Sequence, residues 1–121
     1  MQSILIVEDE PLVALEWKET LEAAGYRVDR TIDSADLVLS AVHEAQPDLI
    51  LMDIRLKSYL DGVDATQRLR LFTQTPVVFL TAWSSPDVQA RAQRSGGDGY
   101  LVKPVDPPAL LSAVRQALAH A

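Results

Sequence analysis

Residues 4–11 read Ile-Leu-Ile-Val-Glu-Asp-Glu-Pro, an apolar run followed by three acids and a proline. Four consecutive apolar residues without alternation are typical of a strand that is covered on both faces of a parallel sheet. Pro11 suits the first turn of a helix, where its missing N–H costs nothing. The segment therefore predicts a buried strand over residues 4–7, an acidic turn, and a helix capped by Glu10.

The same unit, a short apolar run and then a stretch with helical periodicity, recurs along the chain. Strict alternation of this kind predicts an α/β fold in which five (βα) units form a doubly wound, five-stranded parallel sheet with helices on both faces and right-handed crossovers. The predicted strands are residues 4–7, 26–31, 49–52, 77–80 and 100–102, and the predicted helices begin near residues 11, 34, 63, 85 and 107.

Apolar stripes predict which helical residues face the sheet. Trp17 falls on the stripe of the first predicted helix, so we expect it to be a core residue. In chain order the stripes of the first, second and fifth predicted helices are Val13, Trp17, Leu21 and Ala24; Leu37, Val38, Ala41, Val42 and Ala45; and Leu111, Val114 and Leu118. The third predicted helix holds Val63, Thr66, Leu69 and Phe72, and the fourth contains Val88, Ala92 and Gln93.

Composition excludes several classes of function. A length of 121 residues suits one domain over residues 1–121, and we expect no separate effector domain in it. The chain has no cysteine, which excludes disulfides, thiolate metal sites and cysteine nucleophiles. Its 17 acidic and 11 basic residues give a net charge of −6. This balance disfavours direct binding of nucleic acid, because phosphate contacts need clustered Lys and Arg.

The sequence also lacks the marks of a membrane or exported protein. No apolar run approaches the roughly 20 residues that cross a bilayer. Residues 1–3, Met-Gln-Ser, lack the basic region of a signal peptide. We therefore expect a soluble, cytoplasmic protein without membrane insertion.

Polar side chains follow four of the five predicted strands. In chain order they are Glu8 and Asp9, then Asp53, Thr81 and Lys103. Because the carboxyl ends of the strands share one edge of a doubly wound sheet, where ligands bind, we expect these side chains to converge. Any one of them alone could be a helix cap, a turn residue or a surface charge.

This set of side chains indicates phosphoryl chemistry. Neighbouring carboxylates raise one another's pKa, and a hard divalent cation relieves their repulsion. Oxygen ligands without His or Cys favour Mg²⁺ or Mn²⁺. A lysine and a threonine hydroxyl suit an oxyanion, and a carboxylate can act as the nucleophile that forms an aspartyl phosphate.

Five segments carry a resemblance to a known family. They are residues 4–11, residues 48–55 (Asp-Leu-Ile-Leu-Met-Asp-Ile-Arg), Asp61-Gly62, residues 76–82 (Pro-Val-Val-Phe-Leu-Thr-Ala) and residues 99–104 (Gly-Tyr-Leu-Val-Lys-Pro). Together they make the whole chain resemble the receiver domain of two-component response regulators, of the chemotaxis-regulator type. The resemblance implies a flavodoxin-like sheet with strand order 2-1-3-4-5.

The resemblance implies a phosphoacceptor and a metal site. Asp53 would accept the phosphoryl group. Mg²⁺ would bind the carboxylates of Asp9 and Asp53 directly and Glu8 through water. The backbone carbonyl of Arg55 would complete the protein ligands.

The resemblance also implies a phosphoryl-binding set and a switch. Lys103 would pair with phosphoryl oxygens, and the Thr81 hydroxyl and the backbone N–H of Ala82 would donate to them. Tyr100 stands at the family's aromatic switch position, where its movement would be coupled to that of Thr81. The resemblance also implies that the Lys103–Pro104 peptide bond is cis. Only about 5–6% of X–Pro bonds in folded proteins have this conformation.

Two features vary within the family. Lys57 stands where many members have a proline, and the loop over residues 53–62 is one residue longer than in common members. Arg55 and Trp83 would flank the path of the water that hydrolyses the acyl phosphate. Because both are large and neither is a good general base, we expect slow loss of phosphate.

The implied function is signalling rather than enzymatic turnover. A sensor histidine kinase or histidine phosphotransfer protein would phosphorylate the domain, which would then control a downstream protein or a fused effector domain. A homodimer through the fourth helix, fifth strand and fifth helix is one form of output.

Three alternatives stay open. The first is a phosphate sink or adaptor without an output of its own. The second is a flavodoxin-like protein that binds a nucleotide or flavin, which the acids at residues 8–10 disfavour. The third is a metal-dependent phosphatase, which would need an acid where Arg55 stands.

Overall fold

The strands form one parallel sheet in the order β2-β1-β3-β4-β5. The computed structural model describes residues 1–56, 58–82 and 85–120. The fold class, the topology and the strand order predicted above are confirmed. The elements are β1 (Ser3–Val7), α1 (Pro11–Ala23), β2 (Arg27–Ile32), the 3₁₀ turn η1 (Ala35–Leu37), α2 (Val38–Ala45), β3 (Leu49–Met52), α3 (Gly62–Leu69), β4 (Val77–Thr81), α4 (Pro86–Arg94), β5 (Gly99–Val102) and α5 (Pro107–Ala119).

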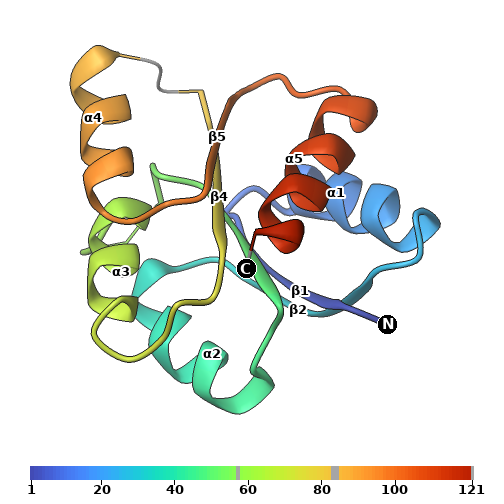
Figure 1. Cartoon of the computed structure of the whole chain (residues 1–121), viewed down its shortest axis with the longest axis horizontal. Coiled ribbons are helices and arrows are strands. Elements are labelled where there is room, and N and C mark those ends of the chain that lie inside the picture. Colours follow the sequence, from blue (N-terminus) through green and yellow to red (C-terminus); the bar gives the residue numbers. More distant parts are fainter. Residues whose placement is uncertain (57, 83–84, 121) are drawn as a thin grey trace.

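Two layers of helices cover the sheet. α1 and α5 lie on one side of it, and α2, α3 and α4 lie on the other (Figure 1). Successive residues of β1 alternate between the two cores, so that Ile4 and Ile6 pack with α1 and α5 while Leu5 and Val7 pack with the other layer. All four are at most 1% exposed. Burial on both faces explains why this strand has no polar alternation.

Most helix starts follow capping chemistry, but the N-cap residues of α1 and α2, Glu10 and Leu37, make no side-chain capping bond. The side chains of Ser34, Ser85 and Asp106 each accept a hydrogen bond from a backbone N–H in the first turn that follows. Glu10 occupies the N-cap position of α1, but its side chain makes no capping bond. The predicted N-cap position of Glu10 is therefore confirmed, but its side chain does not cap the helix. Its longer side chain places it outside the residues that favour this position, which are Asn, Asp, Ser and Thr.

Some stripe residues lie on the surface, and these predictions are wrong. Helical periodicity continues in the sequence past the point at which a helix ends, and it does not distinguish an α-helix from a 3₁₀ turn. Leu37 lies in η1 and is 48% exposed, and Phe72 follows the end of α3 and is 75% exposed. The exposed set is Ala24, Leu37 and Phe72.

The buried face of α5 shares Val114 with the predicted stripe, and its other two residues each lie one position earlier in the sequence than predicted. Val114 is fully buried, as expected, whereas Leu111 and Leu118 are only partly buried. Leucines at neighbouring positions give two stripes of similar apolarity, and only packing against the sheet chooses between them. The buried residues of this helix are Leu110, Val114 and Ala117.

The helices are short. In the described part of the chain, none has the length and apolarity that a membrane span requires. The longest, α1 and α5, have 13 residues each, against about 20 for a bilayer.

Candidate functional site

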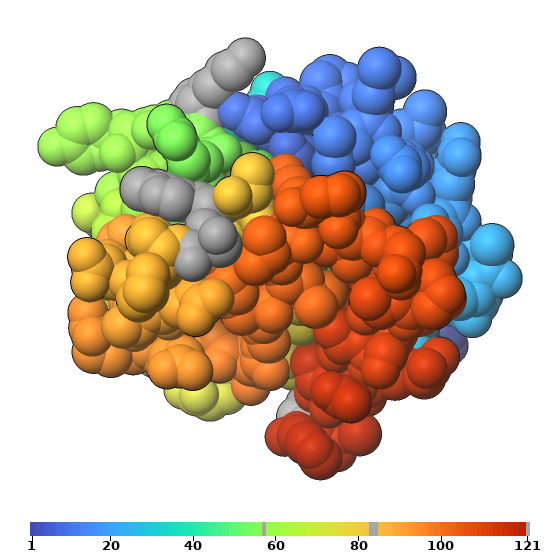
Figure 2. Space-filling model, turned by 90° about the horizontal axis from the view of Figure 1, so that it is seen from above, coloured from blue at the N-terminus to red at the C-terminus, as the bar shows by residue number. Residues whose placement is uncertain are grey.

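The polar residues that follow the strands lie at one edge of the sheet. Glu8 and Asp9 come directly after β1, Asp53 after β3 and Lys103 after β5, while Thr81 is the last residue of β4. Seen from above, the chain segments around these residues meet on one face of the molecule (Figure 2). Four strands therefore deliver side chains from distant parts of the sequence to one place.

Lys103 joins two of the carboxylates. Its ammonium Nζ lies 2.7 Å from Glu8 Oε2 and 3.0 Å from Asp53 Oδ2. The Lys103 side chain is 19% exposed, and those of Glu8 and Asp53 are 0% and 6% exposed. The backbone N–H of Lys103 donates to the carbonyl of Thr81 at 2.8 Å, which fixes the end of β5 against β4. The peptide bond between Lys103 and Pro104 is cis, as expected.

Backbone contacts hold the two carboxylates in place. The Asp53 N–H donates to the carbonyl of Val7 at 3.0 Å, which extends the pairing of β1 and β3 by one residue. The Arg55 N–H donates to Asp53 Oδ1 at 3.3 Å, and the Glu10 N–H donates to Glu8 Oε1 at 3.1 Å. Glu10 thus reaches the site through its backbone rather than through its side chain.

Gly62 explains the Asp61-Gly62 motif. A Cβ atom at this position would overlap the backbone carbonyl of Asp53 and the side chain of Met52. The Gly62 N–H donates to the carbonyl of Ile54 at 2.9 Å. Glycine therefore lets α3 begin directly against the backbone that carries Asp53.

Burial makes the negative charges of this site unfavourable. It raises the pKa of Glu8 to about 7, because desolvation outweighs the bond from Lys103 and the charge of Asp53 adds to it. Burial also raises the pKa of Asp53, although the Lys103 charge opposes the shift. Burial alone would lower the pKa of Lys103. The hydrogen bond to Glu8 and the charge of Asp53 outweigh this effect, so the pKa of Lys103 is raised. One ammonium therefore faces more carboxylate than it can neutralise.

Three carboxylates are close enough to share a cation. One oxygen each from Glu8, Asp9 and Asp53 lies within 4.8 Å of the others. The donors are all hard oxygens, which suit Mg²⁺ or Mn²⁺, and a cation would relieve the cost of these negative charges. Arg55, whose carbonyl was expected as a further ligand, lies two residues after Asp53 with an exposed side chain.

Thr81 and Tyr100 lie on adjacent strands, as the switch hypothesis requires. Thr81 is fully buried and pairs with Val102, and Tyr100 pairs with Phe79. Tyr100 is partly buried against the core on the α2–α4 side, and burial raises its pKa. Ala82, the expected backbone donor, follows β4 directly and is exposed. Lys57 and Trp83 lie outside the described residues.

Sequence reasoning missed one contact at the site. Trp17 is a core residue, as predicted, at 6% exposure. It also lies under the site, because Lys103 Nζ is 5.2 Å from the centroid of its ring. No sequence signal links residues 86 positions apart on α1 and after β5, so this contact follows from packing alone.

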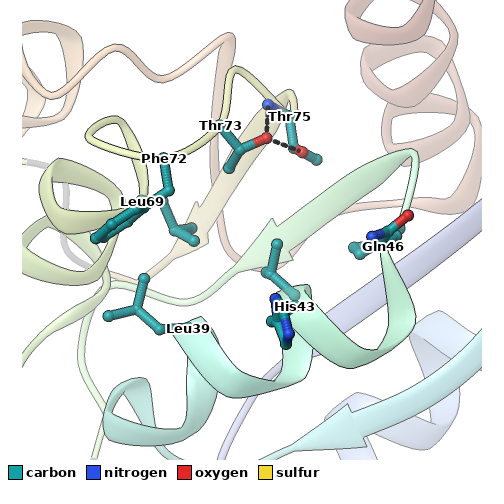
Figure 3. Close-up of a pocket in the computed structure, with 9 residues that line it drawn as sticks. Leu39, His43, Gln46, Leu69, Phe72, Thr73 and Thr75 are labelled. Carbon is teal, nitrogen blue, oxygen red and sulfur yellow. Dashed lines mark hydrogen bonds between the residues drawn. The ribbon is translucent and has the colours of Figure 1, made fainter.

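Two hollows help to place the chemistry. One, of about 580 Å³, borders Glu8 and Asp9 and continues along α1. The other, of about 620 Å³, lies between α2 and the segment after α3 (Figure 3). The described residues that line the second include His43 but no carboxylate, lysine or arginine. We assign the site by its chemistry, to the edge that holds the acids.

Comparisons with known proteins show which family the chain resembles. The family model of the response regulator receiver domain matches residues 4–115. The transcriptional regulatory protein PdtaR of Mycobacterium tuberculosis is 32% identical over 117 residues, which cover 97% of this chain and 57% of that protein. The regulator RpaA of Synechocystis is 38% identical over 121 residues, covering 98% and 49%. The chain thus spans about half the length of these regulators.

Other matches are nearer in length. The polar-differentiation response regulator DivK of Brucella anthropi is 31% identical over 123 residues, covering 99% of this chain and 98% of that protein. The receiver domain of a modulated diguanylate cyclase from Desulfovibrio desulfuricans G20 superposes with a TM-score of 0.91 at 32% identity, covering 99% and 95%. A CheY-like receiver from Methanospirillum hungatei gives a TM-score of 0.91 at 26% identity, with the same coverage.

Proposed function

Because this chain belongs to the family of response regulator receiver domains, we propose that it accepts a phosphoryl group on Asp53 from a histidine kinase or a histidine phosphotransfer protein. The observation that carries the proposal is the Lys103 ammonium, which bonds both Asp53 and Glu8 beside Asp9. This arrangement combines a nucleophilic carboxylate, a cation for phosphoryl oxygens and the donors for a metal.

The transfer is a displacement at phosphorus. An oxygen of the Asp53 carboxylate attacks the phosphorus of a phosphohistidine, the P–O bond forms, and the P–N bond breaks to release imidazole, which takes up a proton. We place the nucleophile on Asp53 because its side chain is 6% exposed, whereas that of Glu8 is fully buried. The two Asp53 oxygens accept from the Lys103 ammonium and the Arg55 N–H. These two contacts fix the direction of its oxygens.

The other residues stabilise charge around the phosphoryl group. Lys103 would pair with phosphoryl oxygens, and the Thr81 hydroxyl and the Ala82 N–H would donate to them. Mg²⁺, when bound directly by Asp9 and Asp53 and through water by Glu8, would supply electrostatic stabilisation of the transferring group. Our proposal also keeps the Arg55 carbonyl as a metal ligand, and Arg55 and Trp83 as neighbours of the hydrolytic path.

Phosphorylation would act as a switch. It adds about −1.5 to −2 charge, and it shifts a pre-existing equilibrium by the difference in its binding to the two states. Movement of Thr81 toward the phosphoryl group would leave room for Tyr100 on the adjacent strand. The output would be binding to a downstream protein, to a fused effector domain, or to a second copy through α4, β5 and α5.

The test is metal-dependent phosphorylation. Incubation with acetyl phosphate and Mg²⁺ should add one phosphoryl group, detected by intact-protein mass spectrometry, and omission of Mg²⁺ should abolish the addition. Asp53→Asn should remain unmodified. The control is Asp33→Asn, an exposed acid that directly follows β2, which should be modified like the wild type. Modification of Asp53→Asn, or none in the wild type, would refute the proposal.

A further inference from the structure

Trp17 makes a contact that core packing alone does not require. It lies in the middle of α1 and is one of three buried residues of that helix. The Lys103 ammonium is 5.2 Å from its ring centroid, inside the roughly 6 Å at which a cation is attracted to an aromatic face. Tryptophan gives the strongest attraction of this kind.

The contact gives Lys103 a partner of a different kind. Its two hydrogen bonds go to Glu8 and Asp53, which follow β1 and β3. The ring comes from α1, which carries neither carboxylate. A lysine ammonium is strongly hydrated in water, so at 19% side-chain exposure it gains from an electron-rich surface that replaces lost water. A leucine of the same core would offer volume without that attraction.

Phosphoryl transfer makes the third partner useful. When Asp53 accepts a phosphoryl group, Lys103 must leave the carboxylate oxygen and move to a phosphoryl oxygen. During this exchange one of its two hydrogen bonds is broken. The attraction to an uncharged ring does not depend on the state of Asp53, so it keeps the ammonium at the site throughout.

We propose that Trp17 is a positioning residue for Lys103, and that its indole face holds the ammonium where it can follow the phosphoryl group onto Asp53. The inference rests on the proposed function. It predicts that removal of the ring slows phosphoryl acceptance without removing the acceptor, the metal donors or the lysine.

The first test compares rates of phosphorylation by acetyl phosphate at saturating Mg²⁺, at a temperature where circular dichroism shows every variant to be folded. Trp17→Leu should be slower by about 5-fold, which corresponds to about 1 kcal/mol of barrier. Trp17→Phe, which keeps an aromatic face, should recover most of the rate. The control is Leu21→Ala, a buried residue of the same helix and core, which should lower thermal stability and leave the rate unchanged.

A double-variant comparison separates positioning from packing. If Trp17 acts through Lys103, then Trp17→Leu should have no further effect on the rate in a Lys103→Met background. A purely structural role would slow both backgrounds alike. Equal rates for wild type and Trp17→Leu, or loss of rate by Leu21→Ala as well, would overturn the inference.

A fluorescence measurement tests the contact without phosphorylation. The chain has two tryptophans, so a Trp83→Phe background leaves Trp17 as the reporter. Lys103→Met should change the emission of Trp17, and Arg115→Met, on the exposed face of α5, should not. An unchanged emission would overturn the inference even if Trp17→Leu fails to fold. If wild type takes no phosphate while this emission changes, the proposed function fails and the contact stands.

Discussion

Two cations lie at opposite ends of β5, and they differ in what surrounds them. Lys103 follows the strand and bonds two carboxylates, Glu8 and Asp53. Arg70, from the end of α3, reaches the turn before the strand, where its guanidinium bonds the carbonyl of Gly96 at 2.9 Å and Asp98 at 3.3 Å. It also donates to the carbonyls of Thr73 and Thr75 after α3.

The difference separates a charge-balanced cluster from an unbalanced one. Arg70 is paired with three carbonyls and one carboxylate, and its five donors match that set. Lys103 is a single charge among carboxylates whose pKa values burial raises. The Arg70 cluster is therefore balanced and should contribute stability. The Lys103 cluster is out of balance until a cation adds positive charge to it.

The largest expected effect is the removal of Arg70. Arg70→Met should lower the free energy of unfolding by about 3 kcal/mol, because the side chain is 14% exposed and it donates to three backbone carbonyls and Asp98, and a hydrogen bond to a charged group typically contributes about 1.5–3 kcal/mol. Urea denaturation measures it. Arg30→Met is the control, since the Arg30–Glu44 pair is 41% and 61% exposed and should contribute below about 0.5 kcal/mol. A similar small loss for both variants would remove the contrast between the two clusters.

A smaller effect on the free energy of unfolding should come from the titration of Glu8. The pKa of Glu8 is about 7 in the folded state, against an ordinary 4.5. The folded protein thus keeps a proton that the unfolded chain releases, so stability is full below pH 4.5 and is lost as pH rises through 7. In metal-free buffer this loss should be about 2–3 kcal/mol between about pH 5 and pH 8.

Unfolding curves with a chelator across this pH range measure the loss. Glu8→Gln should flatten the dependence, and Glu44→Gln on the exposed surface should keep the wild-type slope. An equally steep slope in Glu8→Gln would mean that another group binds the proton, and the imbalance would then not centre on Glu8.

The smallest effect expected is a gain of stability in a variant that lacks the proposed phosphoacceptor. Asp53→Asn removes a buried carboxylate that Glu8 and Asp9 repel, and its one carboxamide oxygen can replace only one of the two oxygens that accept from Lys103 and from the Arg55 N–H. The relief of repulsion should outweigh the lost bond, so the free energy of unfolding should rise by about 1 kcal/mol in metal-free buffer. Mg²⁺ should stabilise the wild type and have little effect on the variant. Thermal unfolding with and without Mg²⁺ tests both statements, and a destabilised Asp53→Asn would show that the cluster is balanced after all.

Most of the fold could be predicted because its signals are local. The unalternating runs of β1 and β3 indicate strands buried on both faces, and prolines and capping residues mark the helix starts. Errors arose where local patterns give two equivalent answers. Leu110 and Leu111 are equally apolar, and only the sheet selects the first of them. Phe72 continues a helical stripe that the backbone no longer follows.

The site could be predicted as a set of residues, because parallel strands bring their carboxyl ends to one edge. Position along the sequence was enough to gather Glu8, Asp9, Asp53, Thr81 and Lys103 there. The sequence could not predict whether the positive and negative charges of these residues neutralise one another. Whether Lys103 neutralises Glu8, or only reduces the cost of its burial, depends on distances and solvent exposure.

The sequence by itself determined the alternation of strands and helices, the edge at which the polar residues gather and the types of side chain that meet there. Each follows from residue type and spacing along the chain. Only the tertiary structure decided that Lys103 lies over Trp17, that Arg70 joins two turns, and that burial raises the pKa of Glu8. These features depend on which side chains share a small volume and on how much water reaches them, and packing sets both.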